Sequence, residues 1–541
     1  MAQTLATPGV YIDEKSSFPN STASIPTAVP AFIGYTERTV RDGQSLINKP
    51  VRITSLAEFH NIFGSGFQAP FTIQPASSEE VDFEVDGKGY EVVPENESRF
   101  IFYDSIRLFF ANGGSTCYII SVGSYYSSVS GSSSAASSSA SSASASASAS
   151  AADKNKKDAS PAPTAKATGR KVNAISKKSL QGGIEALVSY EEPTIVVIPE
   201  AVMLEEADCY GLQQEMLMHC GLKIKNRFAI LDVYNGASAR TYDKNDVITR
   251  FREGVGSNFL AYGAAYFPYV YTSIVQNDEI SYRNISNVDV LEDVLTKEAE
   301  AGDKKKADEL KAEIKRLSQS GADEESLNQT LSTISPAYKK VMQKIKRMMN
   351  VLPPSAGMAG LYSAVDATRG VWKAPANVSF GSAIAPAVNL THDDQEDLNV
   401  TPSGKSINAI RSFIGEGTLV WGARTLDGNS GDWKFINVRR TISYIEQSIK
   451  YAAKPYVYES NSANTWILIR SMINSFLNNL WKQGGLVGTT PDAAYEVQIG
   501  LGTTMTPADI LDGIMRITVK VAVSRPAEFI VITFEQKMQD A

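Results

Sequence analysis

The sequence contains few of the residues that form covalent cross-links or bind metals. Its 541 residues include three cysteines and three histidines, so we expect no disulfide framework and folding in a reducing compartment such as a cytoplasm. No uninterrupted apolar run reaches the roughly 18 residues that a membrane-spanning helix requires. The N-terminal stretch MAQTLATPGVYIDE has neither the basic nor the apolar region of a secretory signal, so none is expected.

Charge and composition narrow the class of protein further. The net charge is −7, with 43% hydrophobic and 21% charged residues, which is typical of a soluble globular protein. Nucleic-acid binding is not expected, because it needs a basic surface that neutralises phosphates. The length indicates two to four domains.

Motifs for nucleotide chemistry are incomplete. The stretch TPSGKS (401–406) ends like a phosphate-binding loop, but the position five residues before Gly404 is Asn399 instead of glycine. A polar turn is therefore the favoured interpretation.

Metal-binding and hydrolase motifs are also incomplete. Cys209, His219 and Cys220 lack paired zinc spacing and a fourth ligand, which favours core packing. The acidic stretch 391–399 lacks the glycine and terminal glutamate of a calcium loop, so we expect a solvated acidic loop. No G-x-S-x-G nucleophile motif surrounds any serine. The sequence predicts no catalytic residue, no cofactor and no metal.

The order of predicted elements divides the chain into regions. Residues 1–20 read as an extended arm, and residues 21–390 as an α/β region, because helix and strand patterns alternate between about 180 and 275 as in a largely parallel sheet. Two insertions interrupt it: a Ser/Ala-rich segment (127–170), expected to be a disordered loop, and charged helices (289–349). Residues 391–541 form a predicted C-terminal domain. The fold class is thus mixed α/β and multidomain.

The C-terminal region shows the clearest helix and strand periodicity. A helix over 465–483 carries a polar stripe at a spacing of four residues, which is either a solvated face or a docking surface for a partner. Terminal strands follow between 514 and 536. The first of them alternates Ile517, Val519 and Val521 with polar residues, as expected for a half-buried strand.

Six fragments in one order suggest a family. They are TPGVYIDE (7–14), TAVPAFIGYTE (27–37), PPSAGMAGLYSAVDATRGVWKAPAN (353–377), FINVRRTISYIEQSI (435–449), TWILIRSMINSFLNNLWKQGGLVG (465–488) and RPAEFIVITFEQ (525–536). Together they resemble the tail-sheath family of contractile phage tails and phage-tail-like injection particles. The stretch VYESNSANTW departs from the family, whose members often carry Glu-Pro-Asn before this tryptophan.

The resemblance implies a fold and a function. It implies a central subtilisin-like α/β layer, a C-terminal α+β domain, and terminal arms that exchange strands between subunits. The implied function is a structural subunit that polymerises around an inner tube and contracts from a metastable extended state. Implied partners are copies of the chain in stacked hexameric rings, the inner tube protein, and baseplate and terminal cap proteins, without nucleic acid or direct membrane insertion. Assembly in the bacterial cytoplasm would precede incorporation into a particle.

Alternatives to this reading remain open. The N-terminal sequence resembles the sheaths of headless injection particles more than those of phages. The particle could nevertheless be a myophage virion tail. Two other classes are a relic hydrolase-like α/β enzyme, and a capsid or surface-layer subunit.

Three groups of residues follow from the resemblance. The junction group, where the chain returns to the domain that faces the tube, contains Asp366, Arg369 and Trp372, with Asp366 and Arg369 expected to pair. The tube-facing group comprises Arg470, Asn474, Asn478 and Lys482. The strand-exchange group comprises Val10, Tyr11, Ile12, Ile517, Val519, Val521, Phe529, Ile530, Val531, Ile532 and Phe534.

Overall fold

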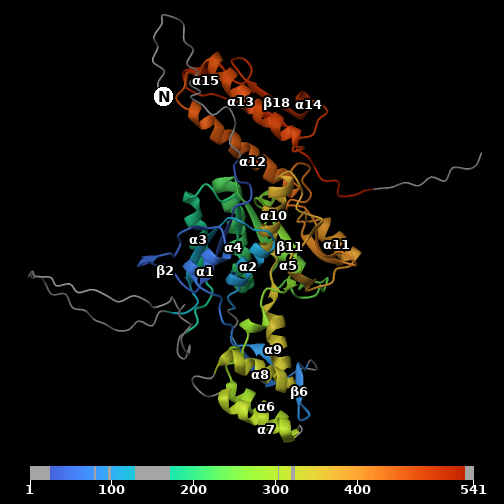
Figure 1. Cartoon of the computed structure of the whole chain (residues 1–541). Coiled ribbons are helices and arrows are strands. Elements are labelled where there is room, and N and C mark those ends of the chain that lie inside the picture. The colour runs from blue at the N-terminus through green and yellow to red at the C-terminus, as the bar shows by residue number, and fades with distance from the viewer. Residues whose placement is uncertain are drawn as a thin grey trace, which may run out of the picture.

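The computed structural model describes residues 25–77, 81–95, 99–127, 171–301, 304–317 and 323–530. Figure 1 shows three parts arranged along one axis, with a sheet-containing central domain between a peripheral helical domain and a C-terminal domain. The predicted arm (1–20) and residues 128–170 of the predicted Ser/Ala-rich loop lie outside the described residues.

The central domain is built on one large sheet. Its strand order is β14-β17-β16-β11-β10-β9-β1-β8-β4. The strands from β16 to β8 pair in parallel, and antiparallel strands complete both edges. The α/β prediction is confirmed. The bounds of the strands, in the order of the sheet, are Val378–Ser379, Gly417–Trp421, Asn408–Phe413, Gly263–Phe267, Phe228–Asp232, Ile195–Val197, Pro30–Thr36, Cys117–Ser124 and Val51–Ile53.

Helices cover both faces of this sheet. Successive residues of β1 point to opposite faces: the ring of Phe32 lies 5.0 Å from that of Phe109 in α2, while Ile33 faces α3. A Cβ on Gly183 of α3 would lie 2.4 Å from Cγ2 of Ile33, so only glycine permits this close approach. The helices of the domain are α1 (Leu56–Phe63), α2 (Phe102–Ala111), α3 (Lys177–Ala186), α4 (Glu206–Met218), α5 (Val247–Gly254), α10 (Ser355–Arg369) and α11 (His392–Asn399).

The peripheral domain joins two segments that are far apart in the sequence. The predicted charged helices are present and pack beside a three-stranded sheet from residues 71–94. Asn287 connects the segments, since its Oδ1 accepts from the Ile73 N–H at 3.0 Å and its Nδ2 donates to the Ile73 carbonyl at 2.7 Å. The elements are β5 (Phe71–Pro75), β6 (Phe83–Val85), β7 (Lys88–Pro94), α6 (Val288–Ala301), α7 (Lys304–Leu317), α8 (Glu324–Ile334) and α9 (Pro336–Met349).

Short strands complete the central region. A small sheet at the base of the helical insertion contains β12 (Val270–Thr272), β13 (Val351–Leu352) and β15 (Ala383–Pro386), and a separate hairpin contains β2 (Val40–Arg41) and β3 (Gln44–Ser45).

The C-terminal domain has its own core. The two long helices α12 and α13 pack with a two-stranded sheet around Ile445, Ile473 and Leu477. The elements are α12 (Ile436–Ala453), α13 (Ala463–Lys482), α14 (Pro491–Ala494), β18 (Tyr495–Ile499), α15 (Pro507–Leu511) and β19 (Ile517–Val521).

The predicted domain boundary at residue 391 is wrong. Strand β16 pairs with β11 through Tyr266–Asn408, and β17 follows it, so residues 391–421 belong to the central domain. The expected acidic loop 391–399 is also different, because it forms α11, with a capping box between Thr391 and Asp394. None of the helices in the described residues is both long and apolar enough to cross a membrane.

Candidate assembly surfaces

The terminal sheet has one buried and one exposed face. Strands β18 and β19 are antiparallel, with Val497 opposite Val519 and Ile499 opposite Ile517. The predicted alternation in β19 is observed: Ile517, Val519 and Val521 pack against the C-terminal core, while Lys520 points outward. Within the described part of the chain no third strand joins this sheet. Its outer edges therefore offer backbone donors and acceptors to an added strand.

The chain after the terminal sheet returns to the central domain. The Arg424 guanidinium binds the Glu528 carboxylate through two hydrogen bonds, of 2.8 and 2.6 Å, and Asn399 Nδ2 donates to the same carboxylate at 2.9 Å. Arg424 is 5% exposed, so the pair lies in a partly dry environment where bidentate bonds are strong. The contact holds the start of the C-terminal segment on its own subunit.

The strand-exchange residues have different outcomes. Phe529 and Ile530 are 69% and 80% exposed and lie in no strand. Two large apolar side chains in water at the end of a held segment are what a neighbouring subunit could cover. The remaining predicted members, which are Val10, Tyr11, Ile12, Val531, Ile532 and Phe534, lie outside the described residues.

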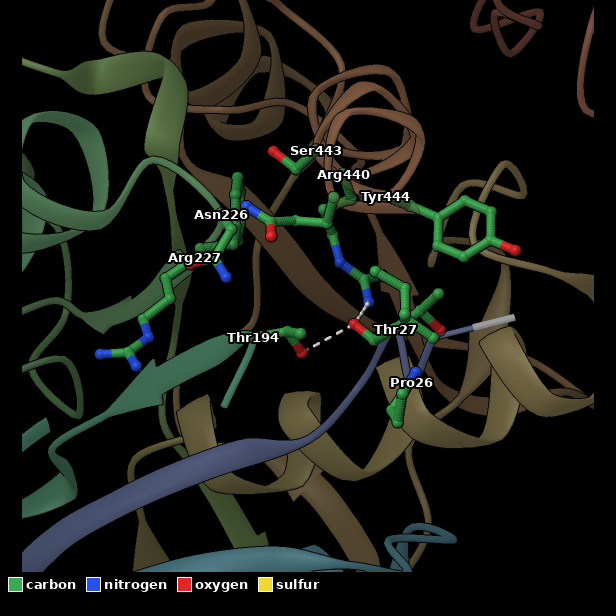
Figure 2. A pocket seen from close by; sticks show the side chains of 11 residues that line it. Pro26, Thr27, Thr194, Asn226, Arg227, Arg440, Ser443 and Tyr444 are labelled. Carbon is green, nitrogen blue, oxygen red and sulfur yellow. Dashed lines mark hydrogen bonds between the residues drawn. The ribbon is translucent and has the colours of Figure 1, made fainter. Parts of the chain in front are cut away.

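The first described residues enter between the central and C-terminal domains. The Thr27 carbonyl accepts from Thr194 Oγ1 at 2.8 Å and from Arg440 Nη2 at 3.2 Å, as Figure 2 shows. Thr194 precedes β9, and Arg440 lies on α12. Thr27, just after the inner end of the N-terminal arm (1–20), is therefore held by both domains.

The junction residues are arranged differently from the prediction. Asp366 forms its ion pair with Arg440, at 2.6 Å, and both side chains are 4% exposed. Arg369, the expected partner, is on the exposed side of α10. The expected pairing is wrong because Asp366 points from α10 toward α12.

Trp372 lies at the seam between the two domains. It follows Gly370, whose φ of 86° ends α10 in a backbone conformation that favours glycine. The indole packs against the C-terminal core, and a Cβ on Gly485 would lie 3.1 Å from its Cδ2. A side chain from the central segment thus helps to complete the core of the other domain.

Comparisons with known proteins agree with this architecture. A family model described as the phage tail sheath C-terminal domain matches residues 429–537. The tail sheath protein of Vibrio phage KVP40 is 26% identical over 229 residues, which are 41% of this chain and 32% of the phage protein. That of Enterobacteria phage T4 is 22% identical over 187 residues, which are 35% of this chain and 27% of the phage protein. The aligned region spans about a third of the length of these curated relatives.

Solved structures match over nearly the whole chain. The cryo-EM structure of the anti-feeding prophage helical sheath in its contracted state matches with a TM-score of 0.56 and 25% identity, covering 99% of this chain and 100% of that chain. The sheath complex of the PVC extracellular contractile injection system, also contracted, shares the fold with a TM-score of 0.56 and 24% identity, covering 99% of both chains. The chain is therefore similar to tail sheath proteins and, over nearly its whole length, to the helical sheath of the anti-feeding prophage.

The predicted tube-facing stripe lies on one flank of α13. Arg470 and Lys482 are exposed, whereas Asn474 and Asn478 are half-buried. The Arg470 guanidinium donates to the carbonyl of Ile499 at the end of β18, so it is partly engaged within the domain. The most exposed apolar residues of the helix, Ile467 at 62% and Leu468 at 55%, lie beside the stripe. Tube contact by this helix stays a prediction.

The nucleotide-like stretch has the geometry of a polar turn. A phosphate-binding loop leads into a helix, but TPSGKS (401–406) leads into strand β16. Lys405 Nζ donates to the carbonyl of Arg252. The lysine that would contact a phosphate is thus engaged within the fold.

The cysteines and histidines occupy separate structural positions. Cys209 and Cys220 are free and buried, and no cluster of ligands suited to a metal ion occurs among the described residues. His219 Nε2 lies 2.6 Å from Nη1 of Arg227, and burial together with this cation lowers the pKa of His219 to about 4. His60 contacts the hydroxyl of Tyr103 at 2.9 Å.

The sequence patterns did not identify two buried carboxylates, Asp232 and Glu200. Asp232, at the carboxyl end of β10, accepts from the Ser355 N–H at the start of α10 at 2.8 Å. Glu200 accepts from the backbone N–H of Tyr35 at 2.8 Å and that of Phe102 at 3.3 Å. Burial raises the pKa of Asp232 to about 7 and that of Glu200 to about 8. Carboxyl ends of parallel strands often bind ligands; here these carboxylates hold helix starts.

Proposed function

We propose that this protein is the structural subunit of a contractile sheath, which polymerises around an inner tube and drives that tube into a target by contracting. The observation that carries the proposal is the match of 99% of the chain to a sheath in its contracted state. The open terminal sheet supports it, because a subunit that polymerises by strand addition needs free strand edges.

The connectivity would come from the two ends of the chain. We propose that the N-terminal arm, around Val10, Tyr11 and Ile12, and the segment after Glu528 of neighbouring subunits add strands beside β18 and β19. Each added strand contributes backbone hydrogen bonds without repacking a core. Subunits could then rotate as rigid bodies while their tethers persist, which allows two packings of the same polymer.

The driving energy would be stored in the extended packing. A difference of a few kcal/mol per subunit, multiplied over many copies, supports motion without nucleotide hydrolysis. This agrees with a chain in which TPSGKS forms a turn and the buried carboxylates hold helix starts. A structural role is therefore favoured over the relic hydrolase.

Partners follow from the relatives. A baseplate structure of the anti-feeding prophage contains a chain that is 25% identical and matches 99% of this one, which supports baseplate association. We also propose stacked hexameric rings, an inner tube partner that contacts the α13 flank, a cap protein, and assembly in the cytoplasm. Since one of the matched sheaths belongs to an extracellular contractile injection system, we favour a headless particle over a virion tail.

Co-expression with a candidate inner tube protein tests the proposal. Negative-stain microscopy should show striated tubes in long, narrow and short, wide forms. A chain that ends at Glu528, which keeps the buried pair with Arg424, should remain folded but form no sheath. The matched control, deletion of residues 128–165, should assemble normally. Ordered tubes from the truncated chain would contradict strand exchange, and absence of any tube from the full chain would contradict the sheath function.

The tube contact has its own test. Glutamate at both Arg470 and Lys482 should weaken assembly around the tube, most at low salt, because an attraction between exposed charges is screened by ions. Glutamine at both positions is the matched control. Normal assembly of the glutamate variant would show that another surface faces the tube.

A further inference from the structure

The N-terminal end of α12 carries four buried polar residues. Two of them, Asn437 and Arg440, are 1% and 5% exposed and bind backbone carbonyls of distant segments. They are three positions apart, so their side chains leave the same side of the helix. Neither was singled out by the sequence, where they stand in the run INVRR. Buried polar side chains are costly unless they are hydrogen-bonded, so their partners indicate what the position is for.

Arg440 connects Thr27, where the N-terminal arm joins the domains, to a buried ion pair. Its Nη1 and Nη2 bind the two oxygens of Asp366 at 3.0 and 2.6 Å. Nη2 also donates to the Thr27 carbonyl at 3.2 Å, as Figure 2 shows. The planar guanidinium stacks over the Tyr362 ring at 4.6 Å from its centroid. A bidentate, stacked arginine has a fixed orientation that lysine would not reproduce.

Asn437 connects the start of the C-terminal arm, which we define as the chain from Ser524 onward, to the interdomain seam. Its Nδ2 donates to the Trp372 carbonyl at 2.8 Å and to the Ser524 carbonyl at 3.0 Å. Ser524 lies three residues beyond the end of β19, and its own N–H donates to the Gly485 carbonyl. One turn of one helix therefore holds a backbone carbonyl at the start of each arm.

We propose that Asn437, Arg440 and Asp366 form a positioning joint that fixes the directions of both arms and passes force between them. The proposal rests on the proposed sheath function, because force arises only if the arms reach different neighbours. A pull on Thr27 passes through Arg440 into α12 and leaves through Asn437 to Ser524, without crossing either hydrophobic core. Neighbouring subunits would then move together, since the joint leaves no slack between the two tethers.

Two variants are designed to weaken the joint. One control variant removes a buried ion pair elsewhere in the chain. The first variant combines Asp366→Asn with Arg440→Gln, which avoids an unpaired buried charge. The second is Asn437→Ala, which leaves the ion pair intact. The control combines Asp246→Asn with Arg240→Gln, because this central-domain pair is also buried, with side chains 0% and 5% exposed, and is remote from both arms in sequence.

Hydrogen exchange of the isolated subunit is the first readout. The Val29 amide in the paired variant and the Ser524 amide in Asn437→Ala should exchange at least about tenfold faster than in the unaltered chain, because local opening becomes easier. The control should leave both amides unchanged. Exchange within about twofold of the unaltered chain in a folded joint variant would overturn the proposal. If the paired variant does not fold, Asn437→Ala decides through the Ser524 amide.

Contraction of assembled particles is the second readout. Joint variants should form extended sheaths that shorten only along part of their length, whereas the control should contract fully. Full contraction of the joint variants would overturn force transmission through α12. If the unaltered chain formed no sheath, the proposed function would fail, while hydrogen exchange would still decide whether the joint holds the arms.

Discussion

The central sheet and the terminal sheet differ in how far a single subunit buries their strands. In the central sheet every residue of β1, β10 and β11 is buried, and helices cover both faces. In the terminal sheet β19 alternates half-buried and exposed residues, and in the described chain two strands form the whole sheet. A two-stranded sheet is marginal by itself. The central sheet is complete within one subunit, and the terminal sheet has room for strands from others.

This difference separates folding from assembly. The central core is continuous from the sheet to the peripheral helices, whereas the terminal core is a separate and smaller cluster. Substitutions in the central domain should therefore change the stability of the free subunit. Substitutions in the terminal sheet should change assembly more than stability.

The largest effect is expected from Phe102→Ala in the central domain. Phe102 is completely buried, and its ring would overlap with a Cβ added to Gly34, which shows how tightly it packs on β1. Removing the ring should lower the free energy of unfolding of the central domain by about 3–5 kcal/mol, as measured by urea denaturation. Phe529→Ala is the control, because this phenylalanine is 69% exposed. Equal effects of the two substitutions would contradict the comparison.

A pH-dependent effect of intermediate size is expected from Asp232→Asn. Burial raises the pKa of Asp232 to about 7 from its usual 3.8, so the folded state holds this proton more tightly than the unfolded state. The stability that this carboxyl contributes is present below about pH 4 and is lost as the pH rises through 7. Asparagine can still accept from the Ser355 N–H but cannot ionise.

The melting temperatures of the variant and the unaltered protein measure this effect. Their difference should shift in favour of the variant between pH 5 and 8, corresponding to about 2 kcal/mol. Asp509→Asn is the control. The N–H and hydroxyl of Thr506 lower the pKa of Asp509 to about 2, so its titration lies below this range. A constant difference for Asp232→Asn would show that this carboxyl does not change its charge between pH 5 and 8.

A smaller effect on the free subunit is expected from Val519→Ala. Val519 is half-buried against α13, so its shortening should cost about 1 kcal/mol of C-terminal domain stability. In an assembled sheath, an added strand would bury this region further, and the same substitution should reduce polymer yield. Thermal unfolding and sedimentation of sheaths measure the two quantities. A loss of stability as large as that of Phe102→Ala would mean that the terminal sheet is complete without a partner.

The smallest effect is expected from Lys520→Ala. Its exposed ion pair with Glu496 spans the two strands at 3.0 Å, and such pairs are weakened by solvent and salt. The melting temperature of the free subunit should be unchanged within error, at low and high salt. A clear, salt-sensitive decrease would show that this pair contributes to holding the two strands together.

Local patterns in the sequence predicted most of the elements. Ser55 caps α1 by accepting from the Glu58 N–H, as its spacing to Glu58 indicates. Asp86 and Gly87, both with positive φ, form the predicted turn between β6 and β7. The alternation of Ile517, Val519 and Val521 gave the buried face of β19. These features were predictable because each depends on residues within a few positions of one another.

Only the tertiary structure decided which distant segments meet. Asp366 pairs with Arg440, 74 positions away, instead of Arg369, three positions away. Asn287 joins Ile73 across 214 positions, and β16 extends the central sheet beyond the expected domain boundary. Local propensity carries no information on such contacts. They form because buried polar groups must find partners and sheet edges must be covered, and the packing of the whole chain determines which partner is within reach.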